Sequence, residues 1–434
     1  MMQKAWKKYL QIIGLLLFLI ALIACINDRI PNVNINETEV PLVSGEDVVS
    51  VKDFGAYGDG IHDDAAAIQK ALNSGYHKIY FPSGEYKCNS FIVMKTPNVK
   101  VTGKKSVIFT DNDYSGKYHE WFFSIVADDI EIENMKFESR ETIKPKFKTQ
   151  VGVMYADRVS FKKCEFNIPE SVLSDAEDRK VEYTNLDIYT DWHDILVEEC
   201  VFHDLADALA GGCVEIRDIK GYRCSGMTFQ KNVLYQNGRD EILGVFSNIS
   251  QKSKTNMLEN VVIDENKFYQ EVGDNYTRHV GLSLGYDGNK GADNVTFSNN
   301  YYSGYADYEF LKLGGSKDVV VENNTLIVNL EDTNAPLYLF RAQTKDQSIY
   351  VKNNSIDVKK NSLGDFAGIG RGYVYYLNND IVCDVNCSDY VFSYLSYVNN
   401  NKVTVSGKLK KKFFSPEVIS KDENEICLND RKMK

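Results

Sequence analysis

One pattern of apolar and polar positions repeats along the chain between about residues 130 and 356. Each copy has two apolar residues separated by one position, a Met, Cys or Asn three positions after the second of them, and an aromatic or aliphatic residue two positions later. The eight copies are Ile130/Ile132/Met135/Phe137, Val159/Phe161/Cys164/Phe166, Ile195/Val197/Cys200/Phe202, Tyr222/Cys224/Met227/Phe229, Val261/Ile263/Asn266/Phe268, Val295/Phe297/Asn300/Tyr302, Val319/Val321/Asn324/Leu326 and Ile349/Val351/Asn354/Ile356. Alternating apolar positions predict strands, and repeats 24 to 39 residues apart predict units that bury their inner faces by stacking.

A second short apolar strand is predicted between successive copies. These segments are 122–126, 151–155, 186–189, 214–217, 242–246, 280–284, 310–313 and 337–340. The irregular spacing does not suit a propeller with blades of fixed length, and the leucine-rich repeat consensus is missing. The pattern favours an all-β fold, a parallel β-helix. Its third positions, from Met135 to Asn354, should form one inward column in which stacked amides bond to one another and the cysteines are packing residues.

The segment before the repeats contains a glycine-rich signature. It reads Val51-Lys-Asp-Phe-Gly-Ala-Tyr-Gly-Asp-Gly-Ile-His-Asp-Asp-Ala-Ala-Ala-Ile-Gln-Lys-Ala71, followed by Ile79-Tyr-Phe-Pro-Ser-Gly-Glu-Tyr86. It resembles the N-terminal signature of the pectate-lyase-like superfamily, which groups rhamnogalacturonases, polygalacturonases, epimerases and phage tailspikes. The resemblance implies a right-handed parallel β-helix. The residues themselves predict a helix over 65–72 whose apolar side, Ile68 and Leu72, would close the open end of the solenoid.

The first 25 residues are typical of an export signal. Lysines precede an apolar run over 12–24, which is too short to span a bilayer as a helix. The run ends Leu22-Ile23-Ala24-Cys25, which resembles the bacterial lipobox, in which the cysteine carries the lipid. We therefore expect a signal peptide over 1–24, lipidation at Cys25, a tether over 25–48, the β-helix over 49–407, and a C-terminal tail over 408–434 that leaves the solenoid. The expected location is the cell envelope, lipid-anchored in the periplasm or at the cell surface.

Composition limits the classes of partner. The chain has 434 residues and a net charge of −11, and no dense Lys/Arg block lies in its body. This acidic balance argues against nucleic acid as a partner. Eight cysteines besides Cys25 are sparse for a disulfide scaffold, and Cys383 and Cys387 form the one close pair, without a zinc motif. We therefore predict no metal site.

Candidate catalytic residues follow from position, because the motifs of polygalacturonase-like relatives are missing. Those relatives carry Asn-Thr-Asp, Asp-Asp and Gly-His-Gly on successive coils, whereas this chain offers only Asn185-Leu-Asp187 as a loose match. If Leu186 and Val214 point inward, Asp187 and Glu215 point outward, about one strand spacing of ~4.8 Å apart. Two carboxylates at this distance suit general acid–base catalysis. The predicted catalytic residues are Asp187, Glu215, Asp240, Glu241 and His279.

Arginine is scarce and unevenly placed. Of 11 arginines, four lie on or beside strands of the same predicted sheet. Arginine binds carboxylate and sulfate through two parallel hydrogen bonds, so an anionic saccharide is the expected ligand. The predicted substrate-binding residues are Tyr189, Arg217, Arg239, Arg278, Lys312 and Arg341.

Three functions remain open at this point. The first is a glycoside hydrolase that cleaves an acidic, uronate-containing polysaccharide with paired carboxylates. The second is a polysaccharide lyase acting by β-elimination, for which a Ca²⁺ ion could neutralise the uronate; hydrolysis requires no cofactor. The third is a non-catalytic surface protein that binds glycans.

Overall fold

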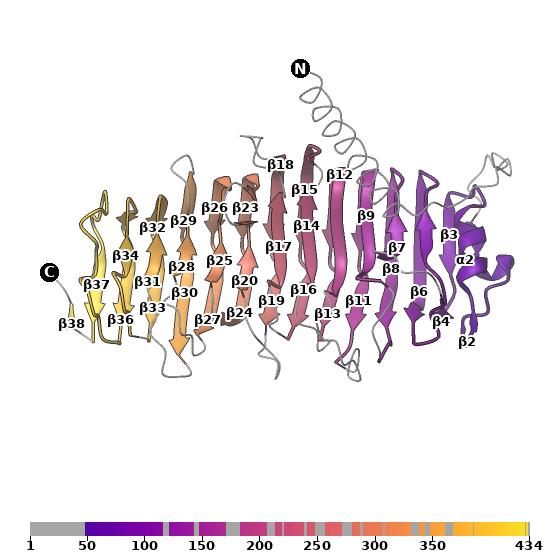
Figure 1. Ribbon diagram of the computed structural model, residues 1–434, viewed down its shortest axis with the longest axis horizontal. Coiled ribbons are helices and arrows are strands. Elements are labelled where there is room, and N and C mark those ends of the chain that lie inside the picture. Colours follow the sequence, from indigo (N-terminus) through magenta and orange to yellow (C-terminus); the bar gives the residue numbers. More distant parts are fainter. Residues whose placement is uncertain are drawn as a thin grey trace, which may run out of the picture.

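A computed structural model describes residues 48–115, 121–142, 147–170, 183–205, 213–218, 221–237, 241–247, 257–270, 280–286, 290–306, 309–330, 338–342, 348–360, 368–384, 386–429 and 431–432. The expected signal peptide with Cys25 lies outside these residues. Within the described part, no helix is long and apolar enough to cross a bilayer. The strands form a stack of coils that runs the length of the molecule, from the indigo end to the yellow end (Figure 1).

Each coil contributes strands to three faces, and the strands of each face pair in parallel with those of the next coil. Face 1 contains β5 (Ile92–Met94), β7 (Trp121–Ile125), β9 (Thr149–Asp157), the first half of β12 (Thr184–Glu198), β14 (Val214–Asp218), β17 (Leu243–Ser247), β20 (Val280–Ser283), β25 (Glu309–Lys312), β28 (Tyr338–Arg341), β31 (Gly368–Arg371) and β34 (Phe392–Ser393).

Face 2 follows face 1 in each coil. It contains β1 (Val48–Ser50), β3 (Lys78–Phe81), the first halves of β6 (Val99–Thr110) and β8 (Ile130–Ser139), β10 (Val159–Lys162), the second half of β12, β15 (Cys224–Gln230), β18 (Leu258–Asp264), β23 (Asp293–Ser298), β26 (Lys317–Glu322), β29 (Ile349–Lys352), β32 (Val374–Leu377) and β35 (Tyr397–Asn399).

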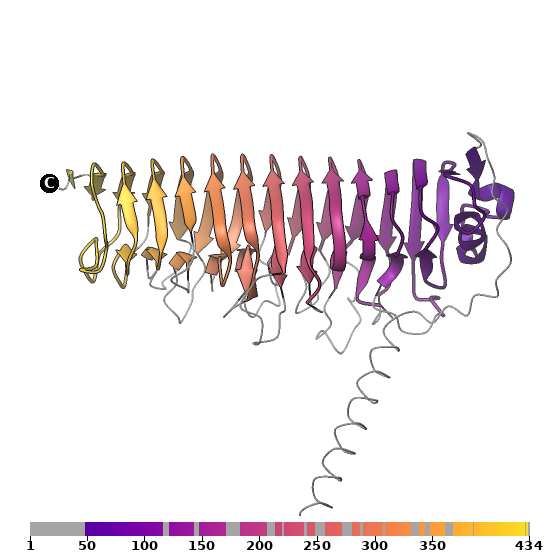
Figure 2. The ribbon, with the colours of Figure 1, turned by 90° about the horizontal axis from the view of Figure 1, so that it is seen from above.

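Face 3 completes the coil. It contains β2 (Asp59–Asp63), β4 (Gly84–Lys87), the second halves of β6 and β8, β11 (Glu165–Ile168), β13 (Val201–Asp204), β16 (Val233–Gln236), β19 (Lys267–Gln270), β24 (Tyr301–Ala306), β27 (Thr325–Leu330), β30 (Ser355–Lys360), β33 (Asp380–Cys383), β36 (Lys402–Val405) and β37 (Glu425–Leu428). The turned view shows the coils side by side (Figure 2), and the predicted parallel β-helix is confirmed.

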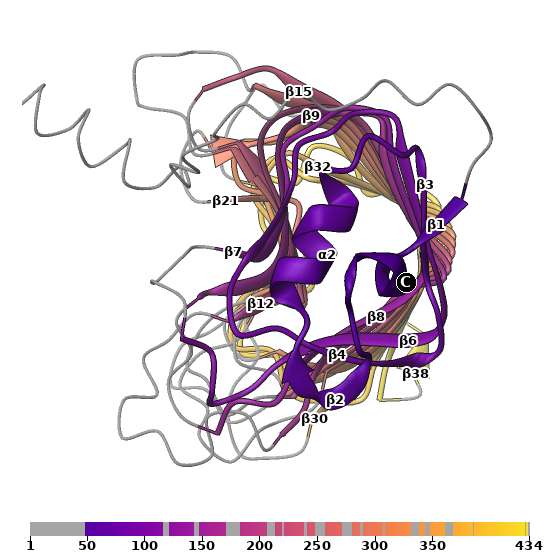
Figure 3. The ribbon, with the colours of Figure 1, turned by 90° about the vertical axis from the view of Figure 1, so that its right-hand side faces the viewer.

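The remaining elements lie outside this pattern. They are a 3-10 turn η1 (Val51–Phe54), the helix α2 (Ala65–Leu72), the antiparallel pair β21 (Gly285–Tyr286) and β22 (Lys290–Gly291), and β38 (Arg431–Lys432), which pairs antiparallel with β37. Helix α2 has the expected bounds and buries Ile68 and Leu72 in the core. The view along the stack shows it at the N-terminal end (Figure 3). Its role in closing that end stays a prediction.

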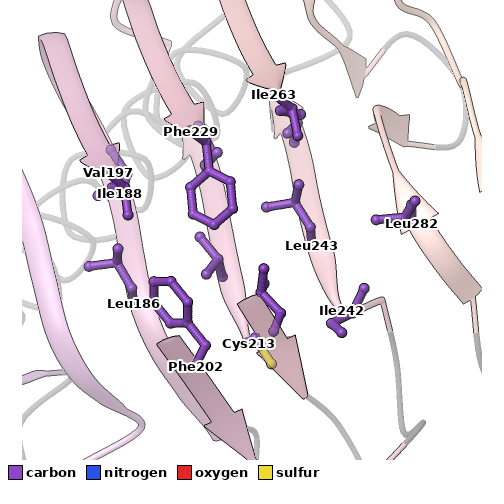
Figure 4. Packing of buried hydrophobic residues seen from close by; sticks show 14 of the residues in the cluster. Leu186, Ile188, Val197, Phe202, Cys213, Phe229, Ile242, Leu243, Ile263 and Leu282 are labelled. Carbon is purple, nitrogen blue, oxygen red and sulfur yellow. The ribbon is translucent and has the colours of Figure 1, made fainter. Parts of the chain in front are cut away.

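The core is a continuous apolar column inside the three faces. Leu186 and Ile188 of β12, Cys213 before β14, and Leu243 of β17 all lie in it (Figure 4). Burying aliphatic side chains contributes about 25 cal/mol per Å² of apolar area. No single coil encloses these side chains, so the stack is stabilised between neighbours.

The predicted asparagine column is confirmed. Asn266, Asn300, Asn324 and Asn354 are buried, and each Oδ1 accepts bonds from the backbone N and the Nδ2 of the asparagine one coil before, at 2.8 to 3.2 Å. The residue before each of these asparagines has a positive φ of 54 to 57°. This left-handed residue turns the chain from face 2 to face 3. The asparagine amide then forms hydrogen bonds with backbone groups that the turn leaves without a strand partner.

The alignment of one repeat was wrong. Met227 pairs with Val261 on face 2, and Asn232 occupies the column instead, where its Oδ1 accepts from the backbone N of Cys200 at 2.8 Å. The copy therefore begins at Met227. Apolar alternation fits both alignments. Only the requirement for an asparagine at the turn between face 2 and face 3 distinguishes them. The eight cysteines at 88 and beyond are free thiols, and those of the column, Cys164 and Cys200, are buried as expected.

The prediction of a C-terminal tail over 408–434 was also wrong. The segment after Val405 does not leave the solenoid, because β37 pairs in parallel with β36 and single bridges join Cys387 to Leu409 and Phe392 to Phe414. The column continues through Asn379, Asn401 and Asn424. The lysine-rich stretch 408–412 therefore belongs to one further coil of the solenoid.

Candidate functional site

One register row crosses face 1 on its outward side. Its members pair in sequence from coil to coil, and we call them the face 1 row: Ser124, Gly152, Asp187, Glu215, Gly244, Ser283, Lys312, Arg341, Arg371 and Ser393. Asp187 pairs directly with Glu215, as the alternation predicted, and Lys312 pairs with Arg341. Residues that are about 30 positions apart in the chain therefore lie about one strand spacing, ~4.8 Å, apart.

Asp187 is not an exposed groove residue, contrary to our expectation. Its side chain is fully buried, and Arg217 binds it through two hydrogen bonds, Nε to Oδ1 at 2.9 Å and Nη2 to Oδ2 at 2.7 Å. Trp121 also donates from Nε1 to Oδ2 at 3.2 Å. Both carboxylate oxygens therefore already accept bonds from a planar guanidinium, the strongest geometry for this pair.

Arg217 joins the two predicted carboxylates. Its Nη1 lies 2.8 Å from Glu215 Oε2, and its guanidinium carbon lies 5.1 Å from the centre of the Tyr189 ring. Burial works against the charge of Arg217, but Asp187 and Glu215 outweigh it and hold its pKa above the ordinary value. This cation therefore keeps its proton and fixes the position of Glu215. Glu215 retains 19% of its side-chain exposure, so it remains accessible from outside.

An aromatic cluster covers Asp187 from the outside. Trp121, Met154 and Tyr189 pack together and are at most 5% exposed, and the Trp121 and Tyr189 rings meet edge to face at 5.1 Å. Tyr189 is thus buried rather than presented as a stacking platform. The Trp121 ring lies over Gly152, where an added Cβ would come within 2.0 Å of Cδ1. Sequence reasoning missed Trp121; the signal was a glycine inside an apolar strand, which often marks a close approach.

Glu241 lies beside Glu215 on the outer side of face 1. A Cβ built on Gly244 would lie 3.3 Å from Glu241 Oε1 and 3.2 Å from the Phe246 ring, so the Glu241 carboxylate sits over the backbone of Gly244. Gly244 is the direct register partner of Glu215. Glu241 is only 7% exposed. The two carboxylates therefore occupy adjacent coils, Glu215 beside Arg217 and Glu241 over Gly244.

The C-terminal half of the face 1 row is cationic. Lys312, Arg341 and Arg371 occupy three successive coils, and Ser283 and Ser393 flank them. Sequence reasoning named Lys312 and Arg341 but missed Arg371, which lies beyond the last repeat copy that was recognised. The row therefore changes sign along the solenoid axis, from Asp187 and Glu215 to these three cations.

Four predicted site residues, Arg239, Asp240, Arg278 and His279, lie outside the described residues, as does Cys25. Among the residues that are described, no group of three or more His, Cys, Asp or Glu side chains could hold a metal ion.

Comparison with known proteins agrees with this fold. Residues 48–239 match the family model described as "Rhamnogalacturonase A/epimerase, pectate lyase-like". The structure of the Streptococcus pneumoniae surface protein and adhesin PfbA superposes with a TM-score of 0.51 at 17% identity, covering 88% of this chain and 100% of that one. At this identity the likeness concerns the fold alone.

Sequence relatives match only short segments. The chain is 40% identical over 65 residues to plasmin and fibronectin-binding protein A of S. pneumoniae, and 52% identical over 42 residues to the mannuronan C5-epimerase AlgE5 of Azotobacter vinelandii. These matches cover 14% and 9% of this chain, and they span 9% and 4% of the respective relatives.

Proposed function

We propose that the protein binds an acidic, uronate-containing polysaccharide along face 1 and hydrolyses it with Glu215 and Glu241. The observation that carries this proposal is the placement of the Glu241 carboxylate over Gly244, the register partner of Glu215. The family model over residues 48–239 and the short match to a mannuronan epimerase support an acidic polysaccharide as the substrate class.

The surroundings of the two carboxylates suggest different roles. Glu215 forms an ion pair with Arg217, an arrangement that suits a nucleophile. Glu241 is only 7% exposed, and a carboxyl that is largely removed from water suits a general acid. Glu215 and its register partner Gly244 are about one strand spacing, ~4.8 Å, apart, and because the Glu241 carboxylate lies over Gly244 we expect the two carboxylates at a similar separation, close to the ~5–5.5 Å typical of retaining glycosidases. The hydrolysis product should therefore retain its anomeric configuration.

Asp187 has a different role in this proposal from the catalytic one expected from sequence. Because both of its oxygens are bonded to Arg217 and Trp121, it acts as a positioning residue that orients Arg217 against Glu215. Replacing it with Asn should alter the pH dependence of turnover through Glu215, whereas Glu215→Gln and Glu241→Gln remove the reacting groups themselves.

The test is an assay of product chemistry on a panel of polyuronates. Reducing ends without ultraviolet absorbance indicate hydrolysis, both signals together indicate elimination, and neither indicates binding alone. Glu215→Gln and Glu241→Gln should each lower turnover at least ~100-fold, the scale of acid–base catalysis. Glu259→Gln, on face 2, is the matched control and should leave turnover unchanged. Full activity in the Glu215→Gln/Glu241→Gln double variant would exclude the proposal.

A second candidate is binding without catalysis. Asp187 is buried and fully bonded, and a curated relative is named for binding plasmin and fibronectin. Under this alternative the wild-type protein binds the polyuronate but releases no product from any member of the panel.

The lipobox-like sequence ending in Cys25 supports attachment to the cell envelope through a lipid. Cys25→Ser should move the protein from the membrane fraction to the soluble fraction and abolish labelling with a fatty-acid analogue. Labelling that persists in this variant would contradict the anchor.

A further inference from the structure

Arg371, in the cationic half of the face 1 row, has surroundings that differ from those of Arg217. The guanidinium carbon of Arg371 lies 4.7 Å from the centre of the Tyr394 ring and 5.7 Å from that of the Tyr338 ring. Among the described residues, no carboxylate lies within ion-pair distance of it. Arg217, by contrast, uses three of its nitrogens on Asp187 and Glu215.

The surroundings of Arg371 are built to hold it without neutralising it. Asp389, which contacts one of these tyrosines, accepts a hydrogen bond from the Tyr338 hydroxyl at 2.7 Å and another from the Lys411 ammonium at 2.7 Å. Asp389 is therefore committed to other partners. Ring contacts engage the flat faces of a guanidinium and leave its N–H edges free to donate. Tyr394 is 49% exposed, so this edge of the site is open to solvent.

Two more cations continue the site toward the paired carboxylates. Arg371 pairs in register with Arg341, and Arg341 pairs with Lys312. A polyuronate presents a row of anionic groups, with one carboxylate on each sugar, and the N–H edges that the ring contacts of Arg371 leave open can bind one of them. Arg371 is four register steps from Gly244, about 19 Å at ~4.8 Å per step.

We propose that Arg371, at the C-terminal end of this cationic run, forms an anion-binding site for the unreacted part of a polymeric ligand, separate from the carboxylate pair that reacts. This inference rests on the proposed function for the identity of the polymer. The polymer then lies along the solenoid axis, and one of its carboxylates binds Arg371 while another part reaches Glu215. The site selects an anionic polymer over a small uronate, because only a chain of several sugars spans both halves of the row.

The experiment measures binding of a uronate octasaccharide by calorimetry. Arg371→Ala should weaken binding about 10-fold or more, since a hydrogen bond to a charged group contributes about 1.5–3 kcal/mol. Arg371→Lys should recover only part of the affinity, because lysine lacks the planar fork. Tyr394→Phe keeps the ring and should bind as the wild type does. Arg223→Ala removes an exposed arginine of face 2 that is paired with Glu259, and it should have no effect.

Ligand controls identify the chemistry. The methyl-esterified octasaccharide keeps its shape but loses its charge, and its binding should not depend on Arg371. A sulfated neutral octasaccharide distinguishes recognition of sulfate from recognition of carboxylate; dependence on Arg371 with either anion supports the site and names its ligand. Equal binding by Arg371→Ala and Arg223→Ala to both anionic octasaccharides would overturn it.

The two proposals fail in different ways. If the octasaccharide binds through Arg371 but is never cleaved, the anion site stands and the hydrolase proposal falls. If cleavage depends on Glu215 while binding and the KM do not change in Arg371→Ala, the hydrolase proposal stands and the anion site falls.

Discussion

Glu141 provides a test of how this fold tolerates a buried carboxyl group. Its side chain is 2% exposed, and its Oε1 has no hydrogen-bond partner among the described residues. The Tyr183 hydroxyl lies 3.4 Å from Oε2, and the carboxylate of Asp111 adds repulsion. Burial raises the pKa of Glu141 from 4.5 to about 7, because the charged form loses its hydration.

The sign of the effect on stability follows from the difference between the pKa of Glu141 in the folded protein and its pKa in the unfolded chain. In the unfolded chain Glu141 loses its proton near its ordinary pKa, whereas in the folded protein it keeps the proton up to about pH 7. Between these values the folded state binds more protons, so stability falls as the pH rises. At about 1.4 kcal/mol per unit of pKa, the folded state should lose about 3 kcal/mol from this group between about pH 4.5 and pH 7. Above pH 7 the loss is constant.

The perturbation is Glu141→Gln, which is neutral at every pH. Relative to the wild type, this variant should gain about 3 kcal/mol in unfolding free energy at about pH 8 compared with about pH 5. Urea unfolding at the two pH values measures the difference, and the exposed Glu417→Gln serves as the control with no change. If the difference between Glu141→Gln and the wild type is the same at both pH values, the reasoning is refuted.

Three further predictions concern packing. Gly152→Ala should displace the Trp121 ring, shift tryptophan fluorescence and lower the melting temperature. Adding Trp121→Phe to this variant should restore part of the lost melting temperature. An unchanged melting temperature in Gly152→Ala would contradict the close contact. Asn300→Ala should cost about 3 kcal/mol in urea unfolding, because it removes the acceptor of two buried Asn266 donors, and Asn424→Ala at the partly exposed end should cost less. In the native protein a thiol reagent should modify Cys427 before the buried cysteines, and mass spectrometry of digests checks the order.

Much of the architecture followed from local pattern. Alternation located the strands of face 1 from β7 to β28, with starts within two residues of the observed ones, but it missed β5, β31 and β34. It also predicted that Leu186 and Val214 point inward. The same rule predicted that Asp187 would adjoin Glu215. It failed at Met227, where two alignments satisfy the apolar positions equally well, and after Val405, where lysines obscure the last coil.

The sequence by itself determined the coil stack, the asparagine column and the row on which the candidate site lies, because period-2 alternation and a recurring corner amide are local properties. Only the tertiary structure decided the environment of each residue in that row. Trp121 reaches Asp187 across 66 positions of sequence and buries it, and Glu241 lies over Gly244 because that residue has no side chain. Alternation predicts that a side chain points outward. The residues that cover this side chain come from other coils, and the pattern within one strand contains no information about them.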